Sequence, residues 1–156
     1  MRKTIVGDRP ETIDKRDGWM NLEDLVTVEV TSETPEFPME GAVTSNGQAG
    51  WRAAGPGVQI IPLLFDNPVS LQHIQLRFDE PNREPMQEFT LRWSSARGGA
   101  ARDIVRQQWN FNPAGSTVEI EEYAVNLNEV SVVELEVDPD VGRDIAPATL
   151  TSWRLR

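Results

Sequence analysis

Apolar and polar residues alternate with a period of two in several segments of this 156-residue chain. In the segment QHIQLRF, Ile74, Leu76 and Phe78 fall on one side of an extended strand, and the polar residues between them fall on the other. The segment EFTLRWS repeats the pattern. One face of such a strand is buried and the other is wet, so the pattern predicts antiparallel sheets packed as a sandwich.

Eight segments carry this alternation or a continuous run of β-branched and apolar residues, with turn residues between them. The expected strands are residues 25–31, 58–65, 71–79, 86–94, 102–111, 117–127, 130–138 and 148–155. Turns are expected at 66–68, 98–99 and 112–115, where Asn, Pro and Gly gather. Eight strands predict an all-β antiparallel β-sandwich of the jelly-roll type, with one short helical turn expected at 14–22.

Two strands are expected at special positions in the sheets. Pro62 has no N–H to donate, which predicts an edge position or a bulge. The segment VEIEEYAVNL is partly polar on both faces, which predicts that it lies near an edge.

Length and composition indicate one domain, with residues 1–22 as an N-terminal segment packing on or preceding a sandwich of residues 23–156. The absence of Cys excludes disulfides, thiolate zinc sites and cysteine nucleophiles. The first twenty residues are charged throughout and contain no apolar signal-peptide core, so a cytoplasmic location is expected. The net charge of −10 argues against general nucleic-acid binding, and no apolar run is long enough for a membrane span.

The order of features resembles the discoidin, or coagulation-factor C-type, domain of the galactose-binding-like superfamily over about residues 25–155. The matching positions are Ser32, Gly41, Ala42, Asn46, Gly47, Trp51, Gln59, residues 65–68, 74–76, 89–94 and 133–137, and residues 153–155. The resemblance implies a galactose-binding-like jelly roll that acts as a non-catalytic binding module through the loops at one end of the sandwich. Carbohydrate is the first expected ligand. A protein partner is the alternative, favoured by the lack of a leader and of a terminal disulfide, and an enzyme is the third class.

Many members of this family hold a structural calcium ion in the loop that here contains Asn46. Glu33 and Asn46 are therefore candidate calcium ligands, although Asn46 stands where the family commonly has Asp. Backbone carbonyls also serve as calcium ligands, so this departure leaves the site possible.

Trp51 and Arg52 lie together in a Gly- and Ala-rich segment. Their functional interpretation is an aromatic ring that stacks on a sugar, beside a guanidinium donor. The alternative is a Trp that anchors the loop over the core and an Arg that pairs with an acid. The resemblance favours the anchor for Trp51 and leaves Arg52 open.

The segment FDEPNREPMQEF gathers Asp79, Glu80, Arg83, Glu84 and Gln87 within nine positions. Side chains of these types bind hydroxyl groups, and loops carry binding residues more often than strands do. The alternative is a solvated turn.

The expected strand 102–111 places Arg106, Gln108 and Asn110 on one face and Trp109 and Phe111 on the other. The polar face is either a recognition surface or an ordinary wet sheet surface. The only histidine of the chain lies on a polar strand face, and no GxSxG motif accompanies it, so no catalytic triad is expected.

Overall fold

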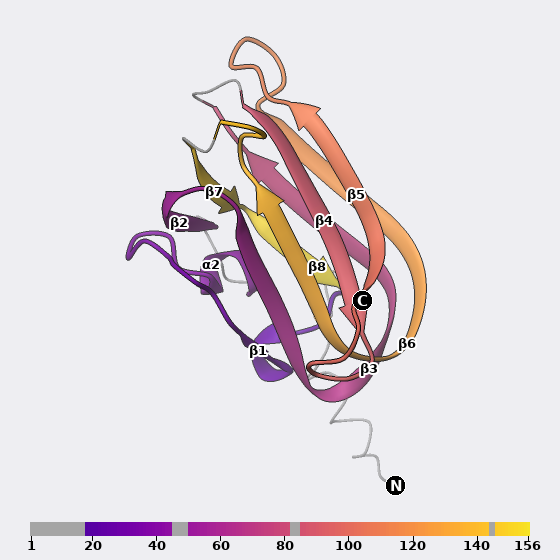
Figure 1. The fold of residues 1–156 in the computed structure, drawn as a ribbon. Coiled ribbons are helices and arrows are strands. Elements are labelled where there is room, and N and C mark those ends of the chain that lie inside the picture. Colours follow the sequence, from indigo (N-terminus) through magenta and orange to yellow (C-terminus); the bar gives the residue numbers. More distant parts are fainter. Residues whose placement is uncertain (1–17, 45–49, 82–84, 144–145) are drawn as a thin grey trace, which may run out of the picture.

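Two long antiparallel strands, β3 (Gln59–Asp79) and β6 (Val118–Asp138), form the frame of the molecule in a computed structural model that describes residues 18–44, 50–81, 85–143 and 146–156. They pair along their length, from Gln59 opposite Val137 to Asp79 opposite Val118. The register shifts between Leu64 and His73, and both strands bend in this region (Figure 1). Each strand therefore contributes one half to each layer of a sandwich.

The first layer contains the early half of β3 and the late half of β6. Its strand order is β1, β3, β6, β4 and β5, all antiparallel. The added strands are β1 (Val26–Val28), β4 (Met86–Ser94) and β5 (Arg102–Asn110).

The second layer contains the early half of β6 and the late half of β3, which pairs on its other side with β8 (Ser152–Leu155). Directly before β8 comes β7 (Pro147–Leu150), which pairs with β2 (Trp51–Pro56). A short 3-10 turn, η2 (Leu22–Asp24), and one helical turn, α2 (Glu40–Val43), complete the fold beside these strands (Figure 1).

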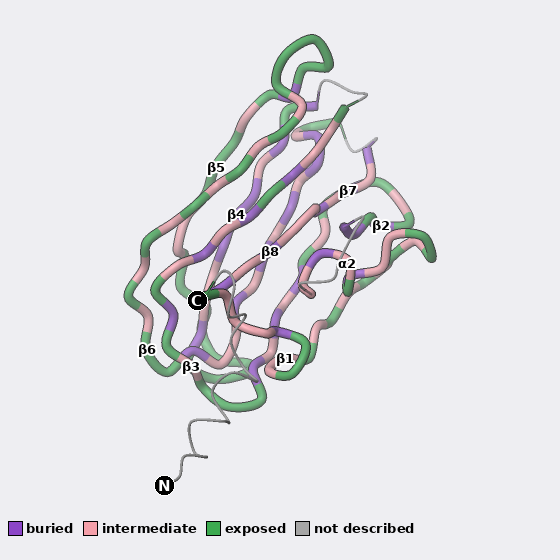
Figure 2. Tube along the Cα trace, turned by 180° about the vertical axis from the view of Figure 1, so that it is seen from behind, coloured by how far each residue is buried: buried purple, intermediate pink, exposed green. Residues whose placement is uncertain are grey.

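The hydrophobic core fills the space between the two layers. Buried residues alternate with more exposed ones along most of β3 and along β8, whereas β4 buries three residues in succession, Phe89 to Leu91 (Figure 2). Near one end of the core, the rings of Phe78, Phe89 and Trp109 lie with their centroids 5.3 to 5.7 Å apart and join the two layers. Burying each such aromatic side chain stabilises the fold by about 1.5–3 kcal/mol.

The predicted fold class is confirmed: the chain is an all-β antiparallel sandwich. Ile74, Leu76 and Phe78 are all buried, as the alternation predicts. Gly98 adopts the positive φ of 74° expected for the turn between β4 and β5, and β6 ends at Asp138 before the Pro. The early half of β6 pairs only with β3 among the described strands, which confirms its edge position.

Several predicted boundaries are wrong. The expected strands 58–65 and 71–79 form one bent strand, and so do 117–127 and 130–138, because the chain crosses between layers through a bulge instead of reversing. Residues 148–155 divide at Thr151, where the chain changes its pairing partner from β2 to β3. The sequence pattern predicts a loop over the residues of β2, but their pairing with β7, distant in sequence, makes them a strand.

Of the expected first strand 25–31, residues 26–28 form the strand β1 in the structure. The N–H of Glu29, just past that short strand, donates to the Pro62 oxygen at 3.3 Å. In an antiparallel strand the nitrogen and the carbonyl oxygen of one residue point to the same side. The Pro62 oxygen faces Glu29, so the Pro62 nitrogen, which has no hydrogen to donate, also faces this position, where the β1 ladder ends. On its other side Pro62 pairs with Glu134 of β6, so β3 is an inner strand here and Pro62 stands where its outer neighbour β1 stops pairing.

The N-terminal segment contacts the sandwich over its described part. The Met20 N–H donates to the Leu155 oxygen at 2.7 Å, and Leu22 is buried in the core. The expected helix at 14–22 is not seen from Gly18 to Asn21, and the helical turn η2 begins only at Leu22. Across the described ranges, the helices are too short and too polar to cross a membrane.

Candidate functional site

A cleft of about 200 Å³ opens beside the end of β3, where β2 begins and β7 meets β8. We call it the Arg52 cleft. It brings together segments that are far apart in the sequence, from Phe37 before β2 to Thr151 between β7 and β8. Its lining residues are Phe37, Trp51, Arg52, Asp79, Pro81, Thr149, Leu150 and Thr151.

Trp51 is a lining residue of the Arg52 cleft, and its side chain is buried in the core. Its side chain is only 1% exposed, and its indole N–H donates to the Ser32 oxygen at 3.1 Å. The ring therefore offers no free face to a ligand, and the structure favours the loop-anchor interpretation of Trp51. Strand alternation then directs the next side chain, Arg52, to the surface.

Arg52 is held over an aromatic ring. Its guanidinium carbon lies 4.9 Å from the centroid of Phe37, and its backbone N–H donates to the Phe37 oxygen at 3.1 Å. A cation over a ring is attracted by the electron-rich face. This contact orients the guanidinium of a residue that lines the cleft, and the planar fork of N–H donors suits it to bind a ligand there.

Asp79 supplies the acceptor of the Arg52 cleft. The Thr151 hydroxyl donates to its Oδ2 at 2.9 Å, and the Arg77 Nε lies 3.3 Å from the carboxylate. The Asp79 side chain is 31% exposed. A carboxylate has about four lone-pair sites, so this one keeps acceptor capacity for a ligand. A donor and an acceptor on one cleft suit a ligand that carries several hydroxyl groups.

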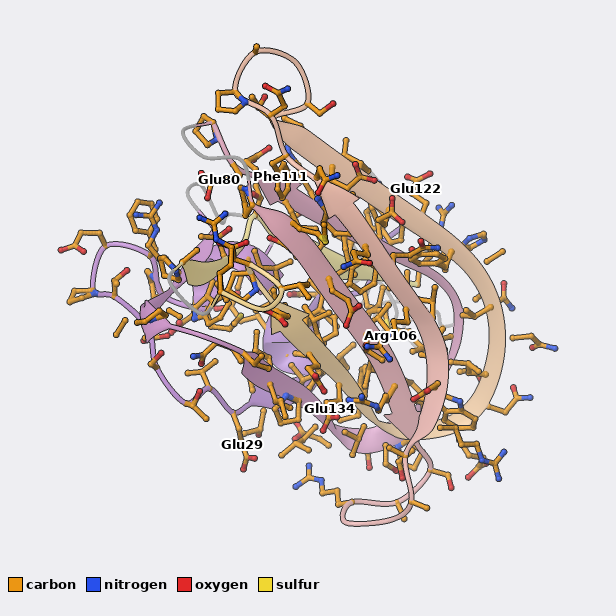
Figure 3. All side chains as sticks on the ribbon, turned by 45° about the horizontal axis from the view of Figure 1, so that its top comes forward. Glu29, Glu80, Arg106, Phe111, Glu122 and Glu134 are labelled. Carbon is orange, nitrogen blue, oxygen red and sulfur yellow. The ribbon has the colours of Figure 1, made fainter. Side chains whose placement is uncertain are left out.

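Among the other predicted ligand residues, the two that the structure describes, Glu80 and Gln87, do not line this cleft. Glu80 lies at the same end of the molecule, where its N–H donates to the Thr117 oxygen at 2.8 Å (Figure 3). Gln87 is 3% exposed and sits opposite Trp109 in the β4–β5 ladder, so its side chain faces the core. The structure thus corrects the expected surface role of Gln87. Arg83 and Glu84 lie outside the described residues.

The predicted calcium ligands are only partly described. The Glu33 carboxylate accepts a hydrogen bond from the Met39 N–H at 3.0 Å, and Asn46 lies outside the described residues. Within the described ranges, no three His, Cys, Asp or Glu side chains converge as a metal site. The calcium site stays a prediction.

The polar face of β5 is exposed, as predicted for Arg106, Gln108 and Asn110. Arg106 pairs with Glu88 at 2.8 Å across the neighbouring strand. On the opposite face Phe111 is buried with 2% exposure. The contacts seen on the polar face are those of an ordinary solvated sheet.

A second polar cluster lies on the inner side of the early half of β6. The hydrogen bond between the Glu119 and Glu121 side chains, helped by burial and by the charge of Glu121, raises the pKa of Glu119 to about 7. The Tyr123 hydroxyl donates to Glu121 at 2.6 Å, and burial raises the pKa of Tyr123. Because the pKa of Glu119 is raised to about 7, this cluster is sensitive to pH near neutrality.

No protein-family model and no curated protein matches the sequence. Solved structures are nevertheless similar in fold. A family 29 fucosidase of Ruminococcus gnavus in complex with fucose is 10% identical, with a TM-score of 0.63, over 97% of this chain and 28% of that one. The family 32 carbohydrate-binding module of Clostridium perfringens NanJ in complex with galactose is 12% identical, with a TM-score of 0.59, over 88% of this chain and 96% of that one.

A third similar structure is reduced XRCC1 bound to the catalytic domain of DNA polymerase β. It is 13% identical, with a TM-score of 0.60, over 85% of this chain and 94% of that one. These likenesses establish the galactose-binding-like fold that the sequence resemblance predicts. The same fold occurs in modules and as part of enzymes, so the function of this chain has to be argued from its own site.

Proposed function

We propose that this protein is a non-catalytic binding module that takes a carbohydrate in the Arg52 cleft. The observation that carries the proposal is the convergence of the Arg52 guanidinium, the Asp79 carboxylate and the Thr151 hydroxyl on one cleft. Sugar hydroxyls both donate and accept hydrogen bonds, and such a set of side chains satisfies both roles. The galactose-bound module of similar fold adds support.

The geometry favours recognition by hydrogen bonds over recognition by stacking. Trp51 is buried, and Arg52 covers one face of the Phe37 ring. The cleft volume of about 200 Å³ is below the range of about 300–1,000 Å³ typical of drug-sized ligands. The site therefore suits one sugar unit, such as the end of a chain, with the rest of the glycan in solvent.

The test is a glycan array, run with and without calcium, followed by calorimetric titration of the sugars that bind. Arg52→Ala removes a charged donor, and we expect about 10- to 100-fold weaker binding. Asp79→Asn removes the charge of the acceptor and is expected to weaken binding in the same direction. Arg106→Ala is the matched control, since this exposed Arg lies on β5 and does not line the cleft. Equal losses for Arg52→Ala and Arg106→Ala would count against the Arg52 cleft as the site.

A protein-interaction module of the same fold is the second candidate. One observation favours it: Val118 and Ile120 are 42% and 52% exposed on the early half of β6, which is an edge. An unpaired edge with exposed apolar side chains is a template for an added strand. An array that stays blank in both conditions, with partner capture that is lost in Ile120→Lys, would establish this function in place of sugar binding.

A further inference from the structure

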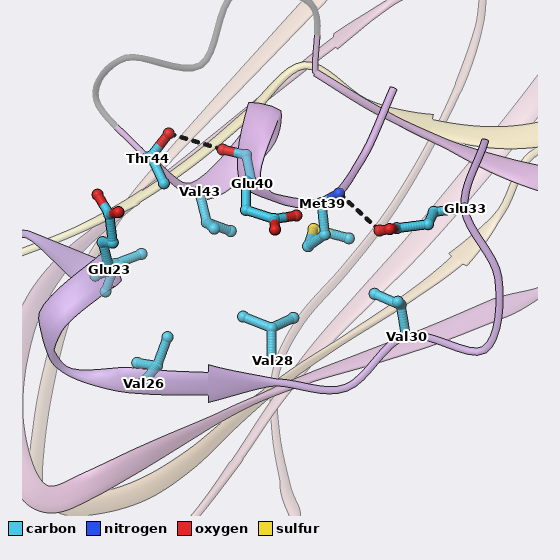
Figure 4. A pocket seen from close by; sticks show the side chains of 10 residues that line it. Glu23, Val26, Val28, Val30, Glu33, Met39, Glu40, Val43 and Thr44 are labelled. Atoms are coloured by element: carbon cyan, nitrogen blue, oxygen red, sulfur yellow. Dashed lines mark hydrogen bonds between the residues drawn. The ribbon is translucent and has the colours of Figure 1, made fainter. Parts of the chain in front are cut away.

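A groove of about 340 Å³ separates the chain around β1 from the helical turn α2 (Figure 4). We call it the Val28 groove. It shares no lining residue with the Arg52 cleft, so a ligand of this groove is independent of the proposed sugar site. Its lining residues are Leu22, Glu23, Val26, Val28, Val30, Glu33, Met39, Glu40, Val43 and Thr44.

The floor of the Val28 groove is aliphatic. Val26 and Val28 of β1 and Val30, two residues past its end, follow one another at every second position, and all three side chains point into the groove (Figure 4). At about 3.3 Å per residue, the floor runs for roughly 13 Å from Val26 to Val30. All three are half-buried, which leaves a strip of apolar surface within reach of solvent. Met39 and Val43 close the groove from the α2 side.

Among the described residues, the side chains at the rim of the Val28 groove offer hydrogen-bond acceptors and no free donor. Glu23, Glu33 and Glu40 line it, and all three are exposed. The one lining hydroxyl, on Thr44, already donates to the Glu40 backbone oxygen at 2.8 Å. Glu33 uses one oxygen to accept the Met39 N–H and keeps the other. No Lys, Arg or His is among the described residues that line the groove.

The carboxylates are spread along the floor and do not form a single cluster. Glu23 lies near the Val26 end, Glu33 near the Val30 end, and Glu40 between them (Figure 4). A compact metal ion needs its ligands close together around one point. Carboxylates spaced along an apolar floor are instead complementary to a ligand whose positive charges are separated by alkyl segments.

From this arrangement we propose that the Val28 groove binds a linear aliphatic polyamine. Its methylene segments would cover the three valines, and its ammonium groups would donate to Glu23, Glu40 and Glu33 in turn. An anion or an acceptor-rich ligand finds only like-charged or acceptor groups at this rim. The groove volume lies within the range of small-molecule sites.

The experiment is a calorimetric titration of the full chain with spermidine at low ionic strength. Octane-1,8-diol serves as the neutral chain and putrescine as the shorter diamine. We expect one spermidine per chain, weaker binding of putrescine, and none of the diol. Glu40→Gln is expected to weaken spermidine binding about fivefold, and Glu23→Gln with Glu40→Gln about 20-fold, with further weakening by salt.

Glu29→Gln is the matched control, because Glu29 lies between Val28 and Val30 but does not line the groove. It removes one carboxylate charge next to the floor valines, as Glu40→Gln removes one at the rim, and is expected to leave spermidine affinity unchanged. Methyl NMR shifts that map to Val26, Val28 and Val30 provide a second readout that does not depend on net charge. Equal losses for Glu29→Gln and Glu40→Gln would reduce the effect to general attraction by an acidic protein and would overturn the proposal. Diol binding as tight as spermidine, or no spermidine binding, would also overturn it.

Discussion

Replacing Trp51 with Phe tests whether this residue is an anchor or part of the binding surface. The indole is 1% exposed and donates one hydrogen bond, to the Ser32 oxygen. Losing that bond costs about 1 kcal/mol, and the smaller ring leaves a gap that costs about another 1 kcal/mol. The expected decrease in the free energy of unfolding is therefore about 2 kcal/mol.

For a chain of this size, that loss lowers Tm by about 4–8 °C. Urea denaturation and calorimetry of wild type and Trp51→Phe measure both quantities. Trp93→Phe is the control, because Trp93 is only half-buried and its ring lies under Arg102 at 5.6 Å. We expect that control to lose less than about 1 kcal/mol.

The anchor interpretation also predicts a separation of stability from binding. At a temperature where both proteins are folded, Trp51→Phe should bind any sugar found on the array within about threefold of wild type, because its side chain is buried beneath the cleft. Unchanged stability together with a complete loss of sugar binding would refute this reasoning and return Trp51 to the ligand surface.

Three further predictions concern other parts of the fold. Glu121 raises the pKa of Glu119 to about 7 in the folded protein, so the contribution of protonated Glu119 to folding stability is full at low pH and is lost as pH rises through about 7. In urea denaturation, wild type should lose about 1 kcal/mol of unfolding free energy between pH 5 and pH 8 relative to Glu119→Gln. Parallel pH profiles of the two proteins would contradict this. The buried Gln87 Nε2 has no hydrogen-bond partner among the described residues, so Gln87→Leu should raise the free energy of unfolding by about 1 kcal/mol. A clear decrease in that free energy would show that the amide is hydrogen-bonded in wild type. Gly50 has a φ of 76°, and a Cβ there would lie 2.6 Å from the Leu150 oxygen. Gly50→Ala should therefore lower the free energy of unfolding, measured by thermal denaturation, by about 3 kcal/mol. A near-neutral effect would contradict the close contact.

Much of the fold follows from local sequence pattern. The alternation that places Leu76 and Phe78 in the core is visible in the sequence, and so is the turn at Gly98. The bends of β3 and β6 are not visible, because Asp66, Asn67 and Pro68 fit a chain reversal as well as a bulge. Which of the two forms depends on how the layers pack.

The Arg52 cleft is predictable only in part. Arg52 is a candidate from its neighbours in sequence, and Asp79 stands out in its acidic segment. Phe37 and Thr151 escape prediction, because each reaches the cleft through a contact between distant parts of the chain. Phe37 accepts the Arg52 N–H, and the Thr151 hydroxyl donates to Asp79. Gln87 shows the opposite error: its spacing of two from Phe89 already indicates a core-facing side chain.

The most direct test of the central claim is an NMR titration of the full chain with galactose and with fucose, the sugars bound in the two similar structures from bacteria. If the Arg52 cleft is the binding site, chemical-shift changes should saturate and concentrate at Arg52, Asp79 and Thr151. Saturation should need about 10- to 100-fold more sugar in Arg52→Ala and the same amount as wild type in Arg106→Ala. Saturating shifts that map elsewhere, such as the exposed edge at Ile120, would contradict the account.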